Sequence, residues 1–395
     1  MKFGIFYELQ LPKPWQEDSE YKLFNEALDQ IELADRLGFD YAWEVEHHFL
    51  EEYSHSSAPE VFLAAASQRT KNIRLGHGIV QLPTNHPARV AERVSTLDLL
   101  SHGRVEFGIG EGSSVTELHP FDRRFRDKRA VWEDAVKAIL PMFWEEGWEY
   151  HGEYFDFPLR NVVPKPKQRP HPPLWVACSQ MDTIRMAGRR GMGALGFSFI
   201  NAEAARAWCH AYYNEYLHNR DLLCDYQTNP NLAVVAPFMC CETDEEAQQK
   251  MDGWSFFQFA LVLYNKEGPF EPGTVNLWER YQEWKEQPER KDVDASAGLV
   301  GSPETIRKRL KQYQEVHVDQ VILLNQAGKN QHADICSSLE LFAEEVLPEF
   351  HADEDNHQRW KQSVLSGETV LEDLDTEQYK VESLQTPVSK QPSAG

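Results

Sequence analysis

The chain has 395 residues, 41% of them hydrophobic and 26% charged, so it is long enough to bury a large core. Its 63 acidic residues outnumber 40 basic ones and give a formal net charge of -23, which disfavours nucleic acid and anionic membrane surfaces as partners. No apolar run approaches membrane-spanning length, and six cysteines without repeated spacing do not make a disulfide framework, so we expect a cytoplasmic protein.

Short apolar segments predict eight strands, and amphipathic segments follow each of them. The strands are expected at 2–7, 39–46, 73–80, 104–109, 174–178, 194–199, 232–238 and 320–325. The helices are expected at 22–37, 58–69, 86–101, 122–146, 180–190, 202–219, 243–264 and 303–316, with a ninth at 332–347. Parallel neighbours need crossover helices, so the pattern favours an α/β fold with a single (β/α)8 TIM barrel. A doubly wound open sheet is the alternative, but it gives no reason for the ninth helix.

Three segments interrupt this alternation of predicted strands and helices. Six prolines within residues 148–173 favour an extended surface excursion. Residues 265–300 predict either a lid over the barrel mouth or a solvated loop with a short helix. The barrel is expected to occupy residues 1–350 with these insertions, and residues 351–395 are expected to be an acidic, partly disordered tail.

The stretch Glu46-His47-His48-Phe49 is the most informative, because it stands where the second predicted strand opens into a loop. Barrels present their reactive groups at this end of the strands, and histidine exchanges protons near neutral pH. Successive strand residues point to opposite faces, so the two histidines are poorly placed to bind one ion, and we expect no metal. The plainer interpretation is that both fill a polar layer at the rim.

Three further strand ends carry candidate ligand contacts. Gly78 and Ile79 lie in a glycine-rich strand that leads into Leu82-Pro83-Thr84-Asn85-His86-Pro87, where a ligand can approach the backbone or a tight turn simply forms. Gly110 and Glu111 lie in a Gly-Ile-Gly-Glu-Gly run that resembles a dinucleotide loop, but Pro120 follows before a long helix can develop.

Cys178 and Ser179 end the fifth predicted strand. Cys178 is a candidate thiol nucleophile, although a small buried apolar group is the plainer role. Ser179 is a candidate phosphate contact at a helix N-terminus, or an ordinary N-cap.

Taken together, these stretches resemble the bacterial luciferase-like family of flavin monooxygenases. The matching segments are Met1-Lys2-Phe3-Gly4, Glu46-His47-His48-Phe49, Leu82-Pro83-Thr84 with His86-Pro87, Leu99–Gly103 with Arg104, Phe107-Gly108, Gly301-Ser302-Pro303-Glu304 and Glu345-Val346-Leu347-Pro348.

The resemblance implies a (β/α)8 barrel with FMN at the C-terminal ends of the strands. It also implies that a separate flavin reductase supplies the reduced FMN. Reduced FMN and O2 would form a C4a-(hydro)peroxide that oxygenates a small or medium organic substrate. The family further implies a homodimer.

By position, the resemblance implies that His47 is an acid or base beside the flavin and that His48 and Glu46 orient it. It implies a non-prolyl cis bond at Gly78-Ile79, flavin contacts near Gly110 and Glu111, and a phosphate contact at Ser179. The chain departs from true luciferases, which have cysteine at Gly110, arginine at Glu111 and glutamate at Cys178. Glu111 would repel a phosphate, so it is expected either to face elsewhere or to leave the phosphate to backbone amides and another arginine, such as Arg185.

Two other functions stay open at this level. A deazaflavin (F420)-dependent hydride-transfer enzyme shares the same superfamily barrel. A non-catalytic flavin-binding protein of this fold is the third possibility, and the intact Glu46-His47-His48 stretch argues against it.

Overall fold

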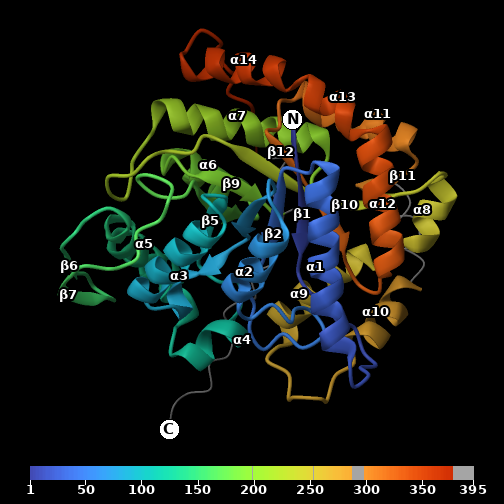
Figure 1. Ribbon diagram of the computed structural model, residues 1–395, viewed down its shortest axis with the longest axis horizontal. Helices are drawn as coiled ribbons and strands as arrows, with labels where there is room; N and C mark the ends of the chain where they lie inside the picture. The colour runs from blue at the N-terminus through green and yellow to red at the C-terminus, as the bar shows by residue number, and fades with distance from the viewer. Residues whose placement is uncertain (198, 252, 287–297, 377–395) are drawn as a thin grey trace.

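The computed structural model of the chain describes residues 1–197, 199–251, 253–286 and 298–376, and it forms a closed parallel barrel wrapped by helices (Figure 1). The barrel strands are β1 (Lys2–Tyr7), β2 (Tyr41–Glu44), β3 (Arg74–His77), β5 (Val105–Gly110), β8 (Leu174–Cys178), β9 (Gly193–Gly196), β10 (Leu232–Cys240) and β12 (Gln320–Gln326). Each pairs in parallel with its neighbour, and β9 pairs with β10 to close the ring. The predicted TIM barrel is therefore confirmed, and the open-sheet alternative is wrong.

The layer of helices follows the predicted order closely. It contains α1 (Ser19–Leu37), α2 (Pro59–Arg69), α3 (Pro87–Leu100), α5 (Lys128–Ile139), α6 (Met181–Arg189), α7 (Ala202–His218), α11 (Pro303–Glu315) and α12 (His332–Glu345). The helix predicted over 243–264 is two helices, α8 (Asp244–Lys250) and α9 (Trp254–Glu267), because Gly253 takes a positive φ of 119° before α9.

Shorter elements decorate the barrel. A two-residue strand, β4 (Val80–Gln81), pairs with the end of β5, and β11 (Leu299–Gly301) pairs with β10. Within the proline-rich excursion, β6 (Trp148–His151) and β7 (Asp156–Arg160) form an antiparallel hairpin. The helix α4 (Val115–Leu118) follows β5, and α10 (Leu277–Lys285) follows α9. In Figure 1, α4, α9 and α10 lie toward one end of the barrel, and α14 lies at the other.

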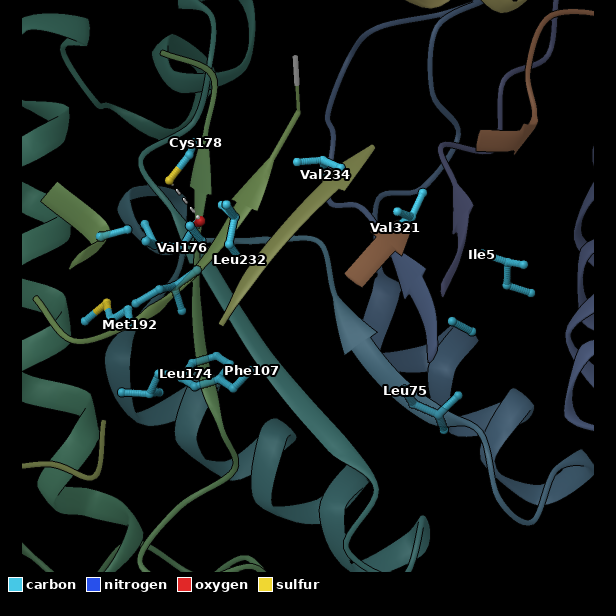
Figure 2. Packing of buried hydrophobic residues seen from close by; sticks show 14 of the residues in the cluster. Ile5, Leu75, Phe107, Leu174, Val176, Cys178, Met192, Leu232, Val234 and Val321 are labelled. Carbon is cyan, nitrogen blue, oxygen red and sulfur yellow. Dashed lines mark hydrogen bonds between the residues drawn. The ribbon is translucent and has the colours of Figure 1, made fainter. Parts of the chain in front are cut away.

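Alternation along the strands separates two apolar layers. On β8, Leu174, Val176 and Cys178 point toward the helices, whereas Trp175 points into the barrel. Figure 2 shows the labelled members of the outer layer, among them Leu174, Val176 and Cys178 on β8. Inside the barrel, the indole of Trp175 meets that of Trp43 edge to face at 5.4 Å. Large side chains therefore fill the interior of the barrel at this level, as they do in other (β/α)8 barrels.

The acidic segment after residue 351 is folded over its first part. The helices α13 (Leu347–Ala352) and α14 (Glu354–Leu365) continue the chain across the N-terminal end of the barrel. On α14, Lys361 Nζ lies 2.9 Å from Oδ1 of the buried Asp319, and His357 Nε2 lies 2.8 Å from the same oxygen. The predicted tail boundary at 351 is thus not where folded structure ends, and residues 377–395 lie outside the described part. No helix within the described ranges is both long and apolar enough to span a bilayer.

Candidate active site at the barrel mouth

Four segments bring acid and imidazole groups together at the C-terminal ends of the first strands. Glu8 follows β1, the Glu46-His47-His48 stretch follows β2, and Gln81 ends β4. Glu117 comes from α4, beyond the end of β5. Parallel strands deliver their loops to one rim, and this explains why residues so distant in sequence meet here.

The centre of this cluster is the fully buried carboxylate of Glu117. Its Oε1 accepts hydrogen bonds from His47 Nδ1 at 2.7 Å and Gln81 Nε2 at 2.7 Å, and from the backbone N–H of His48 at 3.3 Å. Its Oε2 accepts from the hydroxyls of Ser113 at 3.1 Å and Ser114 at 2.9 Å.

These donors decide the charge of Glu117. Burial alone would raise its pKa, but the positive charge of His47 and the donated hydrogen bonds lower the pKa of Glu117 to about 2. Glu117 is therefore an anion at every physiological pH.

His47 is held between two carboxyl groups. Its Nδ1 faces Glu117, and its Nε2 lies 3.1 Å from Oε1 of Glu8. Burial would lower its pKa, but Glu117 and Glu8 together raise the pKa of His47 to about 9. The imidazole side chain keeps 16% of its surface exposed and packs edge to face against Tyr53 at 5.3 Å. A charged, oriented and partly accessible imidazole is a suitable proton donor.

Glu8 is the least satisfied member of the cluster. Only 1% of its surface is exposed, and burial raises its pKa to about 8. Its Oε1 lies close to His47 Nε2 but off the axis of a hydrogen bond, and it has no hydrogen-bond partner among the described residues.

Glu46 and His48 form a second, separate pair. His48 Nε2 lies 3.0 Å from Oε1 of Glu46, which also accepts from Asn85 Nδ2 at 2.9 Å. Oε2 of Glu46 accepts from the Gln81 backbone N–H at 2.9 Å. The two histidines thus use different carboxylates. Over the described ranges, no group of three His, Cys, Asp or Glu side chains is arranged to hold a metal ion.

The Gly78-Ile79 segment differs from the expectation. The four cis peptide bonds found in the described residues all precede proline, so the Gly78-Ile79 bond is trans and the predicted cis bond is wrong. The Gly78 N–H donates to the Glu44 carbonyl at 2.7 Å, which continues the pairing of β2 with β3 in ordinary backbone geometry. Ile79 instead packs against Gly110, where an added Cβ would lie 2.6 Å from Ile79 Cδ1.

Glu111 carries its own counter-ions. It forms an ion pair with Arg129 Nε on α5, and Lys128 Nζ lies 3.9 Å from its other oxygen. Lys128 also donates to the Gly112 carbonyl at 3.0 Å. Glu111 therefore faces cations, and it holds Arg129 and Lys128 beside the rim. Arg185, the sequence-based alternative, lies 3.4 Å from Glu215 instead.

Cys178 and Ser179 occupy different environments although they are adjacent. The Cys178 thiol is fully buried in the outer apolar layer, where it lies 3.3 Å from the Thr183 carbonyl oxygen and 3.5 Å from that of Val176. The dashed line in Figure 2 marks the contact with Val176. Its prediction as a cofactor contact is corrected, because strand alternation turns this position away from the barrel interior. Burial raises the pKa of this thiol to about 12, and the charges that act on it are Arg129 and Glu111. Ser179 is exposed, directly follows Cys178 and lies just before α6.

Aromatic side chains form the remaining wall of the mouth. Phe257 on α9 contacts Phe6, Tyr53 and Phe199 at centroid distances of 6.3, 5.5 and 5.5 Å. The helix α10 packs onto α9, where Trp278 and Tyr281 lie 5.3 and 5.4 Å from Phe256. Glu52, in the loop after β2, accepts the Leu277 and Trp278 N–H groups at 2.5 and 3.1 Å. The described part of segment 265–300 is therefore anchored over this wall, and residues 287–297 lie outside the described ranges.

Sequence reasoning missed Glu8 and Glu117. The sequence feature that could have pointed to Glu8 is its position directly after the first predicted strand. Glu117 stands three residues after Ser114, whose side chain accepts the Glu117 N–H at 3.3 Å and caps α4. That Ser-x-x-Glu spacing indicates a helix start, but it does not reveal that the carboxylate turns toward His47.

A closed barrel with an oriented histidine at its C-terminal mouth defines a class of barrel enzymes with a ligand site at that end. The family model for luciferase-like monooxygenases matches residues 1–320, so the chain belongs to the luciferase-like monooxygenase family.

The chain is similar in sequence to two further proteins, over about half of the first and nearly all of the second. It is 33% identical to the uncharacterized protein y4wF of Sinorhizobium fredii over 193 residues, which are 48% of this chain and 54% of that protein, so this match spans about half of the relative. It is 23% identical over 359 residues to the oxygenase component of the flavin-dependent trigonelline monooxygenase of Acinetobacter baylyi, covering 89% of this chain and 96% of that one.

Solved structures share the fold. The monooxygenase RslO1 from Streptomyces bottropensis superposes with a TM-score of 0.73 at 27% identity, over 89% of this chain and 100% of that chain. The oxygenating constituent of 3,6-diketocamphane monooxygenase from Pseudomonas putida, solved with FMN, gives 0.68 at 20%, over 88% and 98%. The F420-dependent tetrahydromethanopterin reductase from Methanopyrus kandleri gives 0.63 at 19%, over 88% and 99%. At these last two identities the likeness concerns the fold alone.

Proposed function

We propose that the protein is the oxygenase component of a two-component FMN-dependent monooxygenase. It would take reduced FMN from a separate flavin reductase, use O2, and insert one oxygen atom into a small or medium organic substrate. The observation that carries the proposal is His47, an imidazole fixed through Nδ1 by Glu117 with its Nε2 edge accessible at the mouth. The names of the full-length relatives support the same chemistry.

The residues at the rim suit a cofactor with an anionic tail. Arg129 and Lys128 stand beside the end of β8, and the exposed Ser179 precedes the N-terminus of α6, where backbone N–H groups favour anions. We therefore assign the FMN phosphate to Arg129, Lys128 and Ser179. Binding would draw Arg129 from Glu111 toward the phosphate, since a phosphate carries more charge than one carboxylate.

When bound, reduced FMN supplies the electrons that activate O2. The protein would orient the flavin, exclude water and move protons. His47 would deliver a proton from Nε2 to an oxygen of the reacting ligand, and Glu117 would keep the ring in place. The aromatic wall around Phe257 and the anchored helix α10 would shield the reaction from water and accept an apolar or aromatic substrate.

The test is turnover with FMN, NADH and a flavin reductase on a chemically diverse panel of substrates, read by mass spectrometry for a gain of one oxygen. We expect oxygen consumption and product with the wild-type protein, and a loss of roughly 10²–10⁴-fold in coupled product with His47→Gln. If reduced FMN does not bind in a fluorescence or stopped-flow titration, the proposal is refuted.

An F420-dependent hydride-transfer enzyme is the second candidate, because F420-dependent enzymes of known structure share the fold. Anaerobic reduction of F420 by a substrate would favour it. A flavin-binding protein without catalysis is the third, and a tight flavin complex that never consumes oxygen would favour it. We further propose a cytoplasmic homodimer, to be tested by fractionation and by light scattering.

A further inference from the structure

The pairing of Glu8 with His47 has no role in the function proposed above. Glu8 is buried to 1% exposure at the end of β1, and its Oε1 is without a hydrogen-bond partner among the described residues. A buried, unpartnered carboxyl oxygen is costly, so its position beside a reactive imidazole calls for an explanation.

The donors around Glu117 determine which nitrogen of His47 can exchange its proton. Among the described residues, every other group that is hydrogen-bonded to the Glu117 carboxylate is an N–H or O–H donor, and Glu117 is an anion. Nδ1 of His47 must therefore carry a hydrogen and donate it to Glu117. Nε2 is left as the nitrogen that gains and loses a proton.

Nε2 faces Glu8 and the mouth at the same time. Oε1 of Glu8 lies 3.1 Å away but off the N–H axis, so no described residue accepts a hydrogen bond from Nε2. A small rotation of either side chain would bring the two atoms into line. Glu46 on the same loop, Glu44 near Glu8, Tyr53 against the ring, and Lys128 acting on Glu117 are the other titratable groups among the described residues that face this cluster.

From this geometry we infer that Glu8 is a proton reserve for His47, which means that it returns a proton to Nε2 after His47 has given one away. Glu8 acts only through His47, so it is a positioning residue. This inference rests on the proposed function only for the identity of the reacting ligand. After the Nε2–H bond breaks and its proton passes to an oxygen of that ligand, the Glu8 O–H bond breaks and a new Nε2–H bond forms. Water later returns a proton to the Glu8 carboxylate, so protons balance over a cycle.

The raised pKa values of the two groups, about 8 for Glu8 and about 9 for His47, agree with this role. Two groups that interact so closely lose their protons in two steps that belong to the pair. In the wild-type protein, the ring nitrogens of His47 should therefore report two titration steps between about pH 7 and pH 10.

The test is ¹⁵N NMR of histidine-labelled protein between pH 5 and pH 10.5, without cofactor. His47→Gln identifies the His47 signals by their loss. In Glu8→Gln, we expect a single step, with the upper pKa lowered by about one pH unit, since an ionised neighbour shifts a pKa by one unit or more. Because Glu8 is protonated at neutral pH, glutamine replaces it with nearly the same shape and charge, and thermal melting at pH 7 checks that the fold is kept.

Glu44→Gln is the matched control. Glu44 is also buried with a raised pKa, and its charge acts on Glu8, but Ser56 donates to it and it has no hydrogen bond or ion pair with His47. This variant should keep both steps. Two unchanged steps in Glu8→Gln would overturn the inference, as would a wild-type His47 that titrates in one step near pH 6.5.

The pH profile of turnover separates this inference from the proposed function. If oxygenation occurs, Glu8→Gln should lower kcat by 10-fold or more above pH 8 and leave KM for reduced FMN unchanged. If no oxygenation is found but the two NMR steps collapse to one, the proton reserve stands and the proposed function fails. If oxygenation occurs with identical pH profiles in both proteins, the proposed function stands and the role of Glu8 is refuted.

Discussion

Replacing Glu117 by glutamine tests whether charge coupling holds the site together. The substitution removes a buried negative charge and places an NH2 group among donors that need an acceptor, namely His47 Nδ1, the Gln81 side chain and two serine hydroxyls. The pKa of His47 is raised from 6.5 to about 9, largely by Glu117, which corresponds to about 3 kcal/mol because one pH unit is about 1.4 kcal/mol.

The sign of the pH dependence follows from the two shifts. The raised pKa of His47 gives a stabilisation that is complete below pH 6.5 and is lost as the pH rises through about 9. The lowered pKa of Glu117 gives a stabilisation that is complete above pH 4.5 and is lost as the pH falls through about 2. The free energy of unfolding of Glu117→Gln should thus fall short of wild type by about 3 kcal/mol at pH 6, and by clearly less at pH 10.

Urea unfolding followed by circular dichroism at pH 6, 8 and 10 measures these differences. Glu44→Gln is the control, because it makes the same substitution at another buried glutamate, one whose pKa is raised. A deficit of the same size at pH 6 and pH 10 would refute the coupling between Glu117 and His47. A deficit below 1 kcal/mol at pH 6 would refute the magnitude.

Three further substitutions test the cofactor phosphate site, the anchoring of α10 and the contribution of α14 to stability. Arg129→Ala should weaken binding of reduced FMN by about 10-fold or more, and Glu111→Gln should tighten it several-fold by releasing Arg129; equal affinities in a fluorescence titration would remove Arg129 from the phosphate site. Glu52→Gln should raise hydrogen exchange in α10 by about tenfold or more, because the helix loses a carboxylate that accepts from Leu277 and Trp278; unchanged exchange would mean that Glu52 does not anchor the helix. Lys361→Met should lower the free energy of unfolding by about 3 kcal/mol by leaving Asp319 with a weaker set of partners, and a change below 1 kcal/mol in urea titrations would show that α14 contributes little.

The sequence was sufficient for the barrel, because each strand is a short apolar segment with helical sequence after it. The alternation on β8 follows directly from the order of Trp175 among Leu174, Val176 and Cys178. The break before α9 depends on the positive φ of Gly253, a single residue inside an otherwise continuous helical pattern. Propensity alone could not locate it.

The acidic composition after residue 351 concealed α14. What holds this helix is a buried contact between Lys361 and Asp319, and a pairing across the fold leaves no local pattern in the sequence.

The site was predictable only where its residues are neighbours in sequence. Glu46, His47 and His48 form one visible stretch, whereas Glu8 and Glu117 reach His47 only because parallel strands bring their ends to one rim. The roles expected at Glu111 and Cys178 depended on family positions. The pairing of Glu111 with Arg129 is one of the outcomes the sequence left open, whereas the Cys178 side chain packs in the outer layer.

The most direct measurement is an anaerobic titration of the protein with reduced FMN and, separately, with reduced F420, followed by mixing of the complex with oxygenated buffer. We predict that reduced FMN binds, that Arg129→Ala weakens its binding, and that His47→Gln changes the rate at which the bound flavin is reoxidised. Binding of reduced F420 without binding of reduced FMN would contradict the assignment of FMN as the cofactor.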